Sequence, residues 1–300
     1  MKKDLRNAFA SSTQKQYSSN WASFKLFAKS INRSYIPASR NTISLFVTFL
    51  HNTQKLKSTT IRTYLSAVTH YHNLNGFDSK TDNFMTETLL NSYAKTDPPP
   101  RIRLAITSKI LCKLLSSIQK IERGFNRILF NSLFVFMYHG LLRSSEVTLS
   151  PSNNHNLKAD QVRLIKRNGM RMVRIAFTSY KHSKPDPPPL YLKETGSVIC
   201  PVKAFVSLLK SYHNQHSSSG VSFFRNEGGV PLSRKDIVQI LQFHLPLIGE
   251  DASAFNTHSF RMGKATDLAE EGYSDEQIKL AGRWYSNAFI KYIKPTIITI

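Results

Sequence analysis

The chain has 300 residues, of which 41 are Lys or Arg and 19 are Asp or Glu, so its formal net charge is +22. This length suits two domains of ordinary size. Hydrophobic residues make up 41% and charged residues 20%, which is enough apolar material for packed cores and excludes a disordered basic tail. Two cysteines exclude a disulfide scaffold and a cysteine-rich zinc site. The longest apolar run is too short to span a bilayer, and the first residues lack the apolar segment of a secretory leader, so we expect an intracellular protein without a membrane partner.

The positive charge is spread over the whole chain. Residues 1–97 hold 13 Lys or Arg and 5 Asp or Glu, and residues 98–300 hold 28 and 14. A basic globular protein attracts polyanions, and nucleic acid is the commonest polyanion inside cells. Two basic halves suggest a clamp around a DNA duplex, although charge alone fits a solvated basic surface or RNA binding as well.

Residues 1–97 have the periodicity of helices and show no strand signal. Apolar side chains recur every three or four positions in four segments. We expect the helices to start near Ser12, Ser39 or Asn41, Ser58 and Asp82. The pattern predicts a small all-α, core-binding-like domain. Three prolines at 98–100 cannot continue a helix and predict a linker over 98–104.

Residues 105–300 are predicted to be mostly helical with one small sheet. Asn168-Gly169 separates two β-rich runs and is a strong hairpin signal. The expected strands are 162–167, 171–177 and 190–192. The expected helices are 107–118, 125–139, 201–213, 233–244, 258–271, 274–281 and 286–293. The predicted fold class is therefore mainly α with a small antiparallel β-sheet (α+β).

His258 and Arg261 are three positions apart, so on a helix their side chains point to the same side. Thr257 is expected to cap that helix, which would place both side chains near its positive end. An anion there could accept hydrogen bonds from the imidazole and the guanidinium. Taken alone, such a pair is more often simply solvated.

Two further segments contain cations in loops or turns. Arg143 follows the predicted end of a helix, and Glu146, three residues later, could hold it as a local ion pair. Lys181 and Lys184 lie in the loop that leaves the second predicted strand. Lysines in such a loop are usually exposed to solvent, but they can also reach into a nucleic-acid groove.

The last predicted helix contains Tyr292, and Trp284 precedes it. A phenol with a pKa near 10 is a poor nucleophile at neutral pH. Its attack on phosphorus becomes plausible where cations stabilise the pentavalent phosphorane and an acid assists the leaving oxygen. Trp284 could equally pack in a core.

Five motifs in one order resemble the tyrosine recombinase (phage integrase-like) family. They are Gly140-Leu-Leu-Arg143-Ser-Ser-Glu146, a lysine after the hairpin, His258-x-x-Arg261, Gly282-Arg283-Trp284 and Tyr292. The wording around the last three is similar to recombinases of eukaryotic mobile elements such as tyrosine-recombinase retrotransposons. The resemblance covers residues 104–293, whereas the N-terminal part resembles the family's core-binding domain only in size and pattern.

The resemblance implies a catalytic domain over 105–300 and a site-specific DNA recombinase. Such an enzyme cuts and rejoins DNA strands through a 3′-phosphotyrosine intermediate and serves DNA integration or recombination. Arg143 and Arg261 would clamp the scissile phosphate, and Glu146 would orient Arg143. His258 would hydrogen-bond the phosphate or assist the tyrosine's proton, and Trp284 would donate its indole N–H.

The same resemblance implies the covalent chemistry. Tyr292 would attack phosphorus, and Lys181 would protonate the departing 5′ oxygen, with Lys184 as the alternative general acid. No metal, ATP or other cofactor is expected, because the bond energy is kept in the covalent link. The implied partner is double-stranded DNA, held by a homotetramer that is a monomer or dimer when free. The implied location is the nucleus if the host is eukaryotic.

The N-terminal domain contributes candidate DNA contacts as well. Its cations on predicted helices or helix ends would position the DNA backbone rather than specify bases. They are Lys15, Lys25, Lys29, Lys55, Lys57 and Arg62, with Ser58, Thr59 and Thr60 as neutral phosphate donors. For any one of them a solvated helix face is an equally good explanation.

Two other functions stay open beside the recombinase. One is a domesticated DNA-binding protein that has lost catalysis, although none of the five motifs is missing. The other is a type IB topoisomerase-like enzyme that nicks and closes DNA with the same chemistry. The small helical domain ahead of the catalytic part favours the recombinase.

Overall fold

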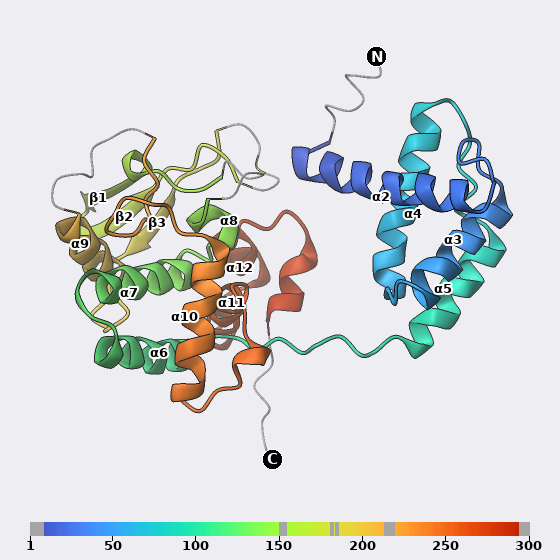
Figure 1. Cartoon of the computed structure of the whole chain (residues 1–300). Helices are drawn as coiled ribbons and strands as arrows, with labels where there is room; N and C mark the ends of the chain where they lie inside the picture. Colours follow the sequence, from blue (N-terminus) through green and yellow to red (C-terminus); the bar gives the residue numbers. More distant parts are fainter. Residues whose placement is uncertain (1–8, 150–154, 181–182, 184–185, 213–219, 294–300) are drawn as a thin grey trace. The chain divides into compact units, whose positions relative to one another are not determined.

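The computed structural model describes residues 9–149, 155–180, 183, 186–212 and 220–293 (Figure 1). Contacts within the chain divide it into two compact units, Met1–Pro100 and Arg101–Ile300, called here the N-terminal unit and the C-terminal unit. In the described residues, every helix is too short or too polar to cross a membrane.

The N-terminal unit contains four helices in its described residues. They are α2 (Ser11–Ser30), α3 (Arg40–Asn52), α4 (Ser58–Leu74) and α5 (Phe84–Thr96). Side-chain caps define two of their starts, because Ser39 accepts a hydrogen bond from the Thr42 amide and Asn83 accepts one from the Thr86 amide, each 3.1 Å long. The apolar faces meet in an aromatic core in which Phe24 and Phe46 are fully buried.

The end of α5 is fastened to the start of α4. One carboxylate oxygen of Asp97 accepts the amide of Ser58 at 2.8 Å and its hydroxyl at 2.6 Å. The ammonium of Lys57 donates to the carbonyl of Pro98 at 2.9 Å. The bonds to Asp97 satisfy the first amide of α4. They also occupy Ser58, whose sequence position suggests a phosphate donor.

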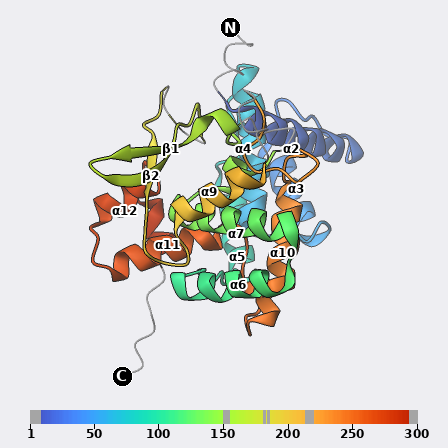
Figure 2. The same ribbon diagram turned by 90° about the vertical axis from the view of Figure 1, so that its left-hand side faces the viewer.

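The C-terminal unit is mainly helical. Its helices are α6 (Ser108–Ile121), α7 (Gly124–His139), α8 (Ser144–Val147), α9 (Pro201–Ser211), α10 (Arg234–Leu247), α11 (Ser259–Glu270) and α12 (Asp275–Ala281). Short 3₁₀ turns complete it at η1 (Ala159–Gln161), η3 (Ala252–Ala254) and η4 (Asn287–Tyr292). α7 is apolar on nearly all sides because α6, α9 and α11 pack around it (Figure 2).

The sheet has three antiparallel strands in the order β1 (Val162–Arg167), β2 (Met170–Ile175) and β3 (Leu190–Lys193). The β1–β2 turn is made by Asn168 and Gly169, whose φ angles of 49° and 76° are those of a two-residue hairpin turn. One face of the sheet packs on α9. The expected hairpin and the expected fold class, mainly α with a small antiparallel sheet, are confirmed.

Three expectations about single elements were wrong. Thr257 does not cap α11: His258 occupies the cap position, and Thr257 is buried. β2 ends at Ile175, because Phe177 leaves the strand and packs into the core instead. The last element, η4, is a 3₁₀ turn rather than an α-helix, and Ser286 caps it by accepting the Ala288 amide at 3.4 Å.

The C-terminal unit has a small second core beside its main one. Leu141, Ala265, Leu268, Ile278 and Phe289 form it. The rings of Trp284 and Tyr292 pack on this cluster from outside. The turn after α7, the helix α11 and the segment after α12 are therefore held together by apolar contact, and each of them carries predicted site residues.

Candidate active site

Glu146 is the centre of the candidate site. Its side chain is completely buried in α8. One oxygen, Oε1, lies 3.1 Å from Nη1 of Arg143, and the other, Oε2, accepts the Arg143 amide at 3.0 Å. Nη2 of Arg283 donates to Oε2 at 2.8 Å. One carboxylate therefore holds two guanidiniums, of which Arg143 is the more exposed.

Arg261 lies on α11 and is only 1% exposed. Its guanidinium donates to the carbonyl of Leu141 and, at 3.0 Å, to the carbonyl of Gly282. Burial, together with the charge of Arg143, lowers the pKa of Arg261 to about 9. Burial also lowers the pKa of Arg283. In both residues the main cause is the removal of the charged guanidinium from water.

The charge balance of this group points to an anion. Within the described residues, the carboxylate of Glu146 pairs with the guanidiniums of Arg143 and Arg283, while that of Arg261 donates to the carbonyls of Leu141 and Gly282. Buried charges are costly unless they are paired. A bound anion would supply the missing negative charge, and the planar guanidinium forks suit a phosphate.

The aromatic and imidazole rings gather beside the arginines. The Tyr292 ring lies 5.2 Å from the Trp284 ring and 6.4 Å from the His258 ring, measured between centroids. The guanidinium carbon of Arg261 lies 4.5 Å from the centroid of Trp284 and 5.8 Å from that of Tyr292. Tyr292 is half-buried and His258 is exposed, so this edge of the cluster opens to solvent.

The backbone at this cluster is tight and strained. A Cβ at Gly282 would lie 1.6 Å from a ring carbon of Trp284, so only glycine lets that ring close over Arg261. Leu141 and Arg283 have positive φ angles of 44° and 55°, which cost non-glycine residues energy. Strained backbone of this kind concentrates at functional sites.

The fold of the chain is similar to that of several solved structures. The structure of XerH site-specific recombinase bound to palindromic difH substrate matches with a TM-score of 0.63 and 18% identity, over 93% of this chain and 75% of that one. The Tn1549 transposon integrase in complex with circular intermediate DNA matches at 0.55 and 14%, over 87% and 83%. A lambda integrase dimer bound to a COC′ core site matches at 0.50 and 14%, over 95% and 72%.

The chain has the tyrosine recombinase fold. The fold that was expected from the five motifs is therefore confirmed. No family model and no curated protein sequence matches the chain. The likeness to recombinases of eukaryotic mobile elements stays a prediction.

Five of the six predicted catalytic residues belong to the described part of this recombinase fold. Arg143, His258, Arg261, Trp284 and Tyr292 come from four separate segments and meet around the second core. The predicted general acid Lys181 and its alternative Lys184 lie outside the described residues.

The sequence did not identify Arg283 as a member of the candidate site. The residue stands inside the quoted motif Gly282-Arg283-Trp284, but it was given no role. Arginine is common in this basic chain, so its type carried no signal. Only the fold shows that its side chain turns inward and is 7% exposed.

The candidate DNA contacts of the N-terminal unit differ in how free they are. Arg62 is paired with Glu87 through two hydrogen bonds of 2.9 Å, which neutralise its charge. Lys57 is occupied by its hydrogen bond to the Pro98 carbonyl. The other four cations are exposed or half-buried on α2 and on the turn after α3: Lys15, Lys25, Lys29 and Lys55.

Two of these lysines line a groove of about 670 Å³ on the N-terminal unit. Lys15 and Lys25 stand beside the aromatic rings of Tyr17 and Trp21 from α2 and Tyr71 from α4. Basic and aromatic side chains together suit a nucleic-acid surface. That Lys15 and Lys25 contact DNA stays a prediction.

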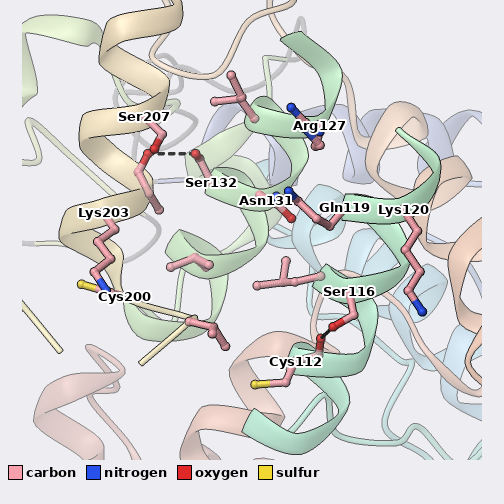
Figure 3. A pocket seen from close by; sticks show the side chains of 15 residues that line it. Cys112, Ser116, Gln119, Lys120, Arg127, Asn131, Ser132, Cys200, Lys203 and Ser207 are labelled. Atoms are coloured by element: carbon pink, nitrogen blue, oxygen red, sulfur yellow. Dashed lines mark hydrogen bonds between the residues drawn. The ribbon is translucent and has the colours of Figure 1, made fainter. Parts of the chain in front are cut away.

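A second hollow of about 630 Å³ lies between α6, α7 and the start of α9 (Figure 3). Both cysteines, Cys112 and Cys200, line it, and Lys120 and Lys203 come from facing helices. It includes none of the predicted catalytic residues that the structure describes. It is therefore separate from the candidate active site.

Proposed function

We propose that this protein is a site-specific DNA recombinase that breaks and rejoins DNA strands through a covalent link to Tyr292. The observation that carries the proposal is the buried, undercompensated group of guanidiniums with a phenol ring 5.8 Å from Arg261. We expect these guanidiniums to bind an anion strongly. The phenol of Tyr292 then supplies the nucleophile. Phosphodiester is the anion that fits a basic protein of this fold.

The phosphate is held first. Arg143 and Arg261 grip its two non-bridging oxygens, and Glu146 keeps the Arg143 fork in place. The indole N–H of Trp284 donates a further hydrogen bond. As phosphorus becomes pentavalent, negative charge grows on these oxygens, and the fixed cations stabilise that charge more than they stabilise the ground state.

Cleavage then exchanges one ester for another. The Tyr292 oxygen bonds to phosphorus, and the bond from phosphorus to the 5′ oxygen breaks. The phenolic proton passes to His258 or to solvent, and the leaving 5′ oxygen takes a proton from Lys181 or Lys184. The products are a 3′-phosphotyrosine and a free 5′-hydroxyl, so no bond energy is lost and no cofactor is consumed.

Rejoining runs the same steps backwards. When the 5′-hydroxyl of a different duplex attacks the phosphotyrosine, the strands are exchanged rather than resealed. Exchange between two duplexes needs four tyrosines, so we propose four copies on DNA. The N-terminal unit, with Lys15 and Lys25, binds the duplex backbone, and binding should weaken steeply as salt concentration rises.

Covalent trapping tests the proposal directly. Randomised DNA duplexes carrying a nick near the centre would be incubated with the full chain, and protein-bound DNA would be recovered under denaturing conditions and sequenced. A nick lets the short 5′-hydroxyl fragment diffuse away and so traps the adduct. We expect an adduct with the wild-type chain and none with Tyr292→Phe, while both chains bind the selected duplex equally.

The same experiment separates the alternatives. Absence of any adduct from the wild-type chain would favour a DNA-binding protein without catalysis. An adduct together with relaxation of a one-site supercoiled plasmid, but no joining between two selected duplexes with different flanks, would favour a nicking-closing enzyme. Joining between the two duplexes is the result we expect.

A further inference from the structure

Arg283 touches two parts of the proposed catalytic machinery at once. Its guanidinium donates to Glu146 at 2.8 Å and to the Gly140 carbonyl at 3.1 Å. The same group lies over the rings of Phe177 and Tyr180, with its central carbon 4.7 and 5.3 Å from their centroids. Arg283 therefore stands between the carboxylate that holds Arg143 and the rings at the start of the β2–β3 loop.

The first contact fixes the phosphate clamp. Glu146 Oε2 accepts both the Arg283 guanidinium and the Arg143 amide, and Oε1 faces the Arg143 guanidinium. Without Arg283, the carboxylate would lose its second charged partner and could rotate. The Arg143 fork would then no longer be held in one orientation.

The second contact is with Phe177 and Tyr180, which follow β2. Tyr180 is 4% exposed and immediately precedes Lys181 in the chain. Its hydroxyl lies 3.3 Å from that of Tyr285, and its amide donates to the Ser183 hydroxyl at 3.1 Å. Among the described residues, Tyr180, the one next to Lys181 in the chain, thus contacts both Arg283 and Tyr285.

We propose that Arg283 is a positioning residue that couples the arginine clamp to the general-acid loop, a role that rests on the recombinase function proposed for the chain. The guanidinium joins Glu146 on one side to Tyr180 on the other, so that the clamp and the acid are set in place together. A lysine there keeps the charge but loses both the planar stacking face and the fork that reaches two acceptors. Arg283 acts through its neighbours and does not itself need to touch the phosphate.

A leaving group that needs no proton tests this coupling. In a 5′-bridging phosphorothiolate, sulfur replaces the leaving oxygen, and a thiol with a pKa of about 8.5 departs as thiolate without an acid. The selected duplex would be made in both forms, and single-turnover cleavage would be measured. We expect Arg283→Lys to slow cleavage of the oxygen substrate by roughly 100-fold, since small misplacement of reacting groups costs about this much.

With the sulfur substrate, the loss from Arg283→Lys should be much smaller, because only the clamp's share of the defect remains. Tyr180→Leu, which removes the ring beneath the guanidinium, should show the same pattern. Equal losses on the two substrates would restrict Arg283 to the clamp and overturn the coupling. Wild-type rates on both substrates would overturn any positioning role.

Arg225→Lys is the matched control. Arg225 is also a buried arginine, 2% exposed, and it lies over an aromatic ring, with its guanidinium carbon 3.8 Å from the Tyr212 centroid. Its replacement should lower thermal stability without changing the rate ratio between the substrates. If the wild-type chain itself forms no covalent adduct, the proposed function fails; if it does and Arg283→Lys behaves as Arg225→Lys, only the coupling fails.

Discussion

The buried charge of Glu146 should be unusually important for stability. Replacing it by glutamine keeps the shape but leaves two guanidiniums without their shared carboxylate, next to Arg261. Breaking a buried ion pair by removing one partner costs roughly 3–5 kcal/mol. At about 2–4 °C per kcal/mol for a unit of this size, Glu146→Gln should lower the Tm of the C-terminal unit by roughly 6–20 °C.

The loss of thermal stability in Glu146→Gln should depend on which anion is present. Thermal unfolding of the full chain would be followed in chloride and in sulfate at equal ionic strength. Sulfate should raise the Tm of Glu146→Gln more than that of the wild-type chain, because the variant's cluster has gained one uncompensated positive charge. The selected DNA duplex should have the same effect at lower concentration, as expected for a ligand that binds only the folded state.

Glu194→Gln is the matched control for Glu146→Gln. Glu194 also pairs with an arginine, Arg171, but that guanidinium side chain is 52% exposed to water. Exposed ion pairs contribute little, so this variant should unfold almost like the wild-type chain and show no special response to sulfate. If both variants lost the same small amount of stability, or if sulfate raised all three Tm values equally, the assignment of an anion site to the arginine cluster would be wrong.

Three further outcomes are expected at the same site. Arg143→Lys loses the bidentate fork and should slow DNA cleavage far more than it weakens DNA binding; equal losses would argue against the clamp. Gly282→Ala should push the Trp284 ring away from Arg261 and reduce cleavage, whereas Gly196→Ala, where nothing lies within 4 Å of an added Cβ, should leave cleavage unchanged. Because burial lowers the pKa of Arg261 to about 9, its charge is complete only well below that pH and half lost at it, so the affinity for sulfate measured by calorimetry should fall as pH rises through about 9.

Local signals predicted most of the secondary structure because each acts within a few residues. Asn168-Gly169 defined the hairpin through its backbone conformation, and the helix expected over 233–244 begins as α10 at Arg234, with Ser233 and Asp236 forming a capping box. The cap at Thr257 failed for a physical reason. Thr257 is 1% exposed, and the turn before α11 is formed instead by Asn256, whose side chain accepts the His258 amide at 2.8 Å.

The candidate site was found by motif order and not by any local signal. Residues 143 and 261 are far apart in the chain, and nothing in their own periodicity shows that both donate toward the same turn, at Glu146 and Leu141. For Arg62, by contrast, a local signal was present but misleading. Its helix position suggested a free phosphate contact, but Glu87, 25 residues later, pairs with it once α4 and α5 pack together.

The arginine cluster and the second apolar core are built from the same segments, since Leu141 belongs to that core and its carbonyl accepts a hydrogen bond from Arg261. Burial first, and then repulsion from Arg143, lowers the pKa values of Arg261 and Arg283, so the folded chain holds these guanidiniums at a cost. The apolar contacts among Leu141, Leu268 and Phe289 help to offset that cost. A phosphate would remove much of the repulsion, so binding energy and fold stability are linked at this site. Under the proposed function, this arrangement exists before the phosphate binds, which is the preorganisation that electrostatic catalysis of phosphoryl transfer requires.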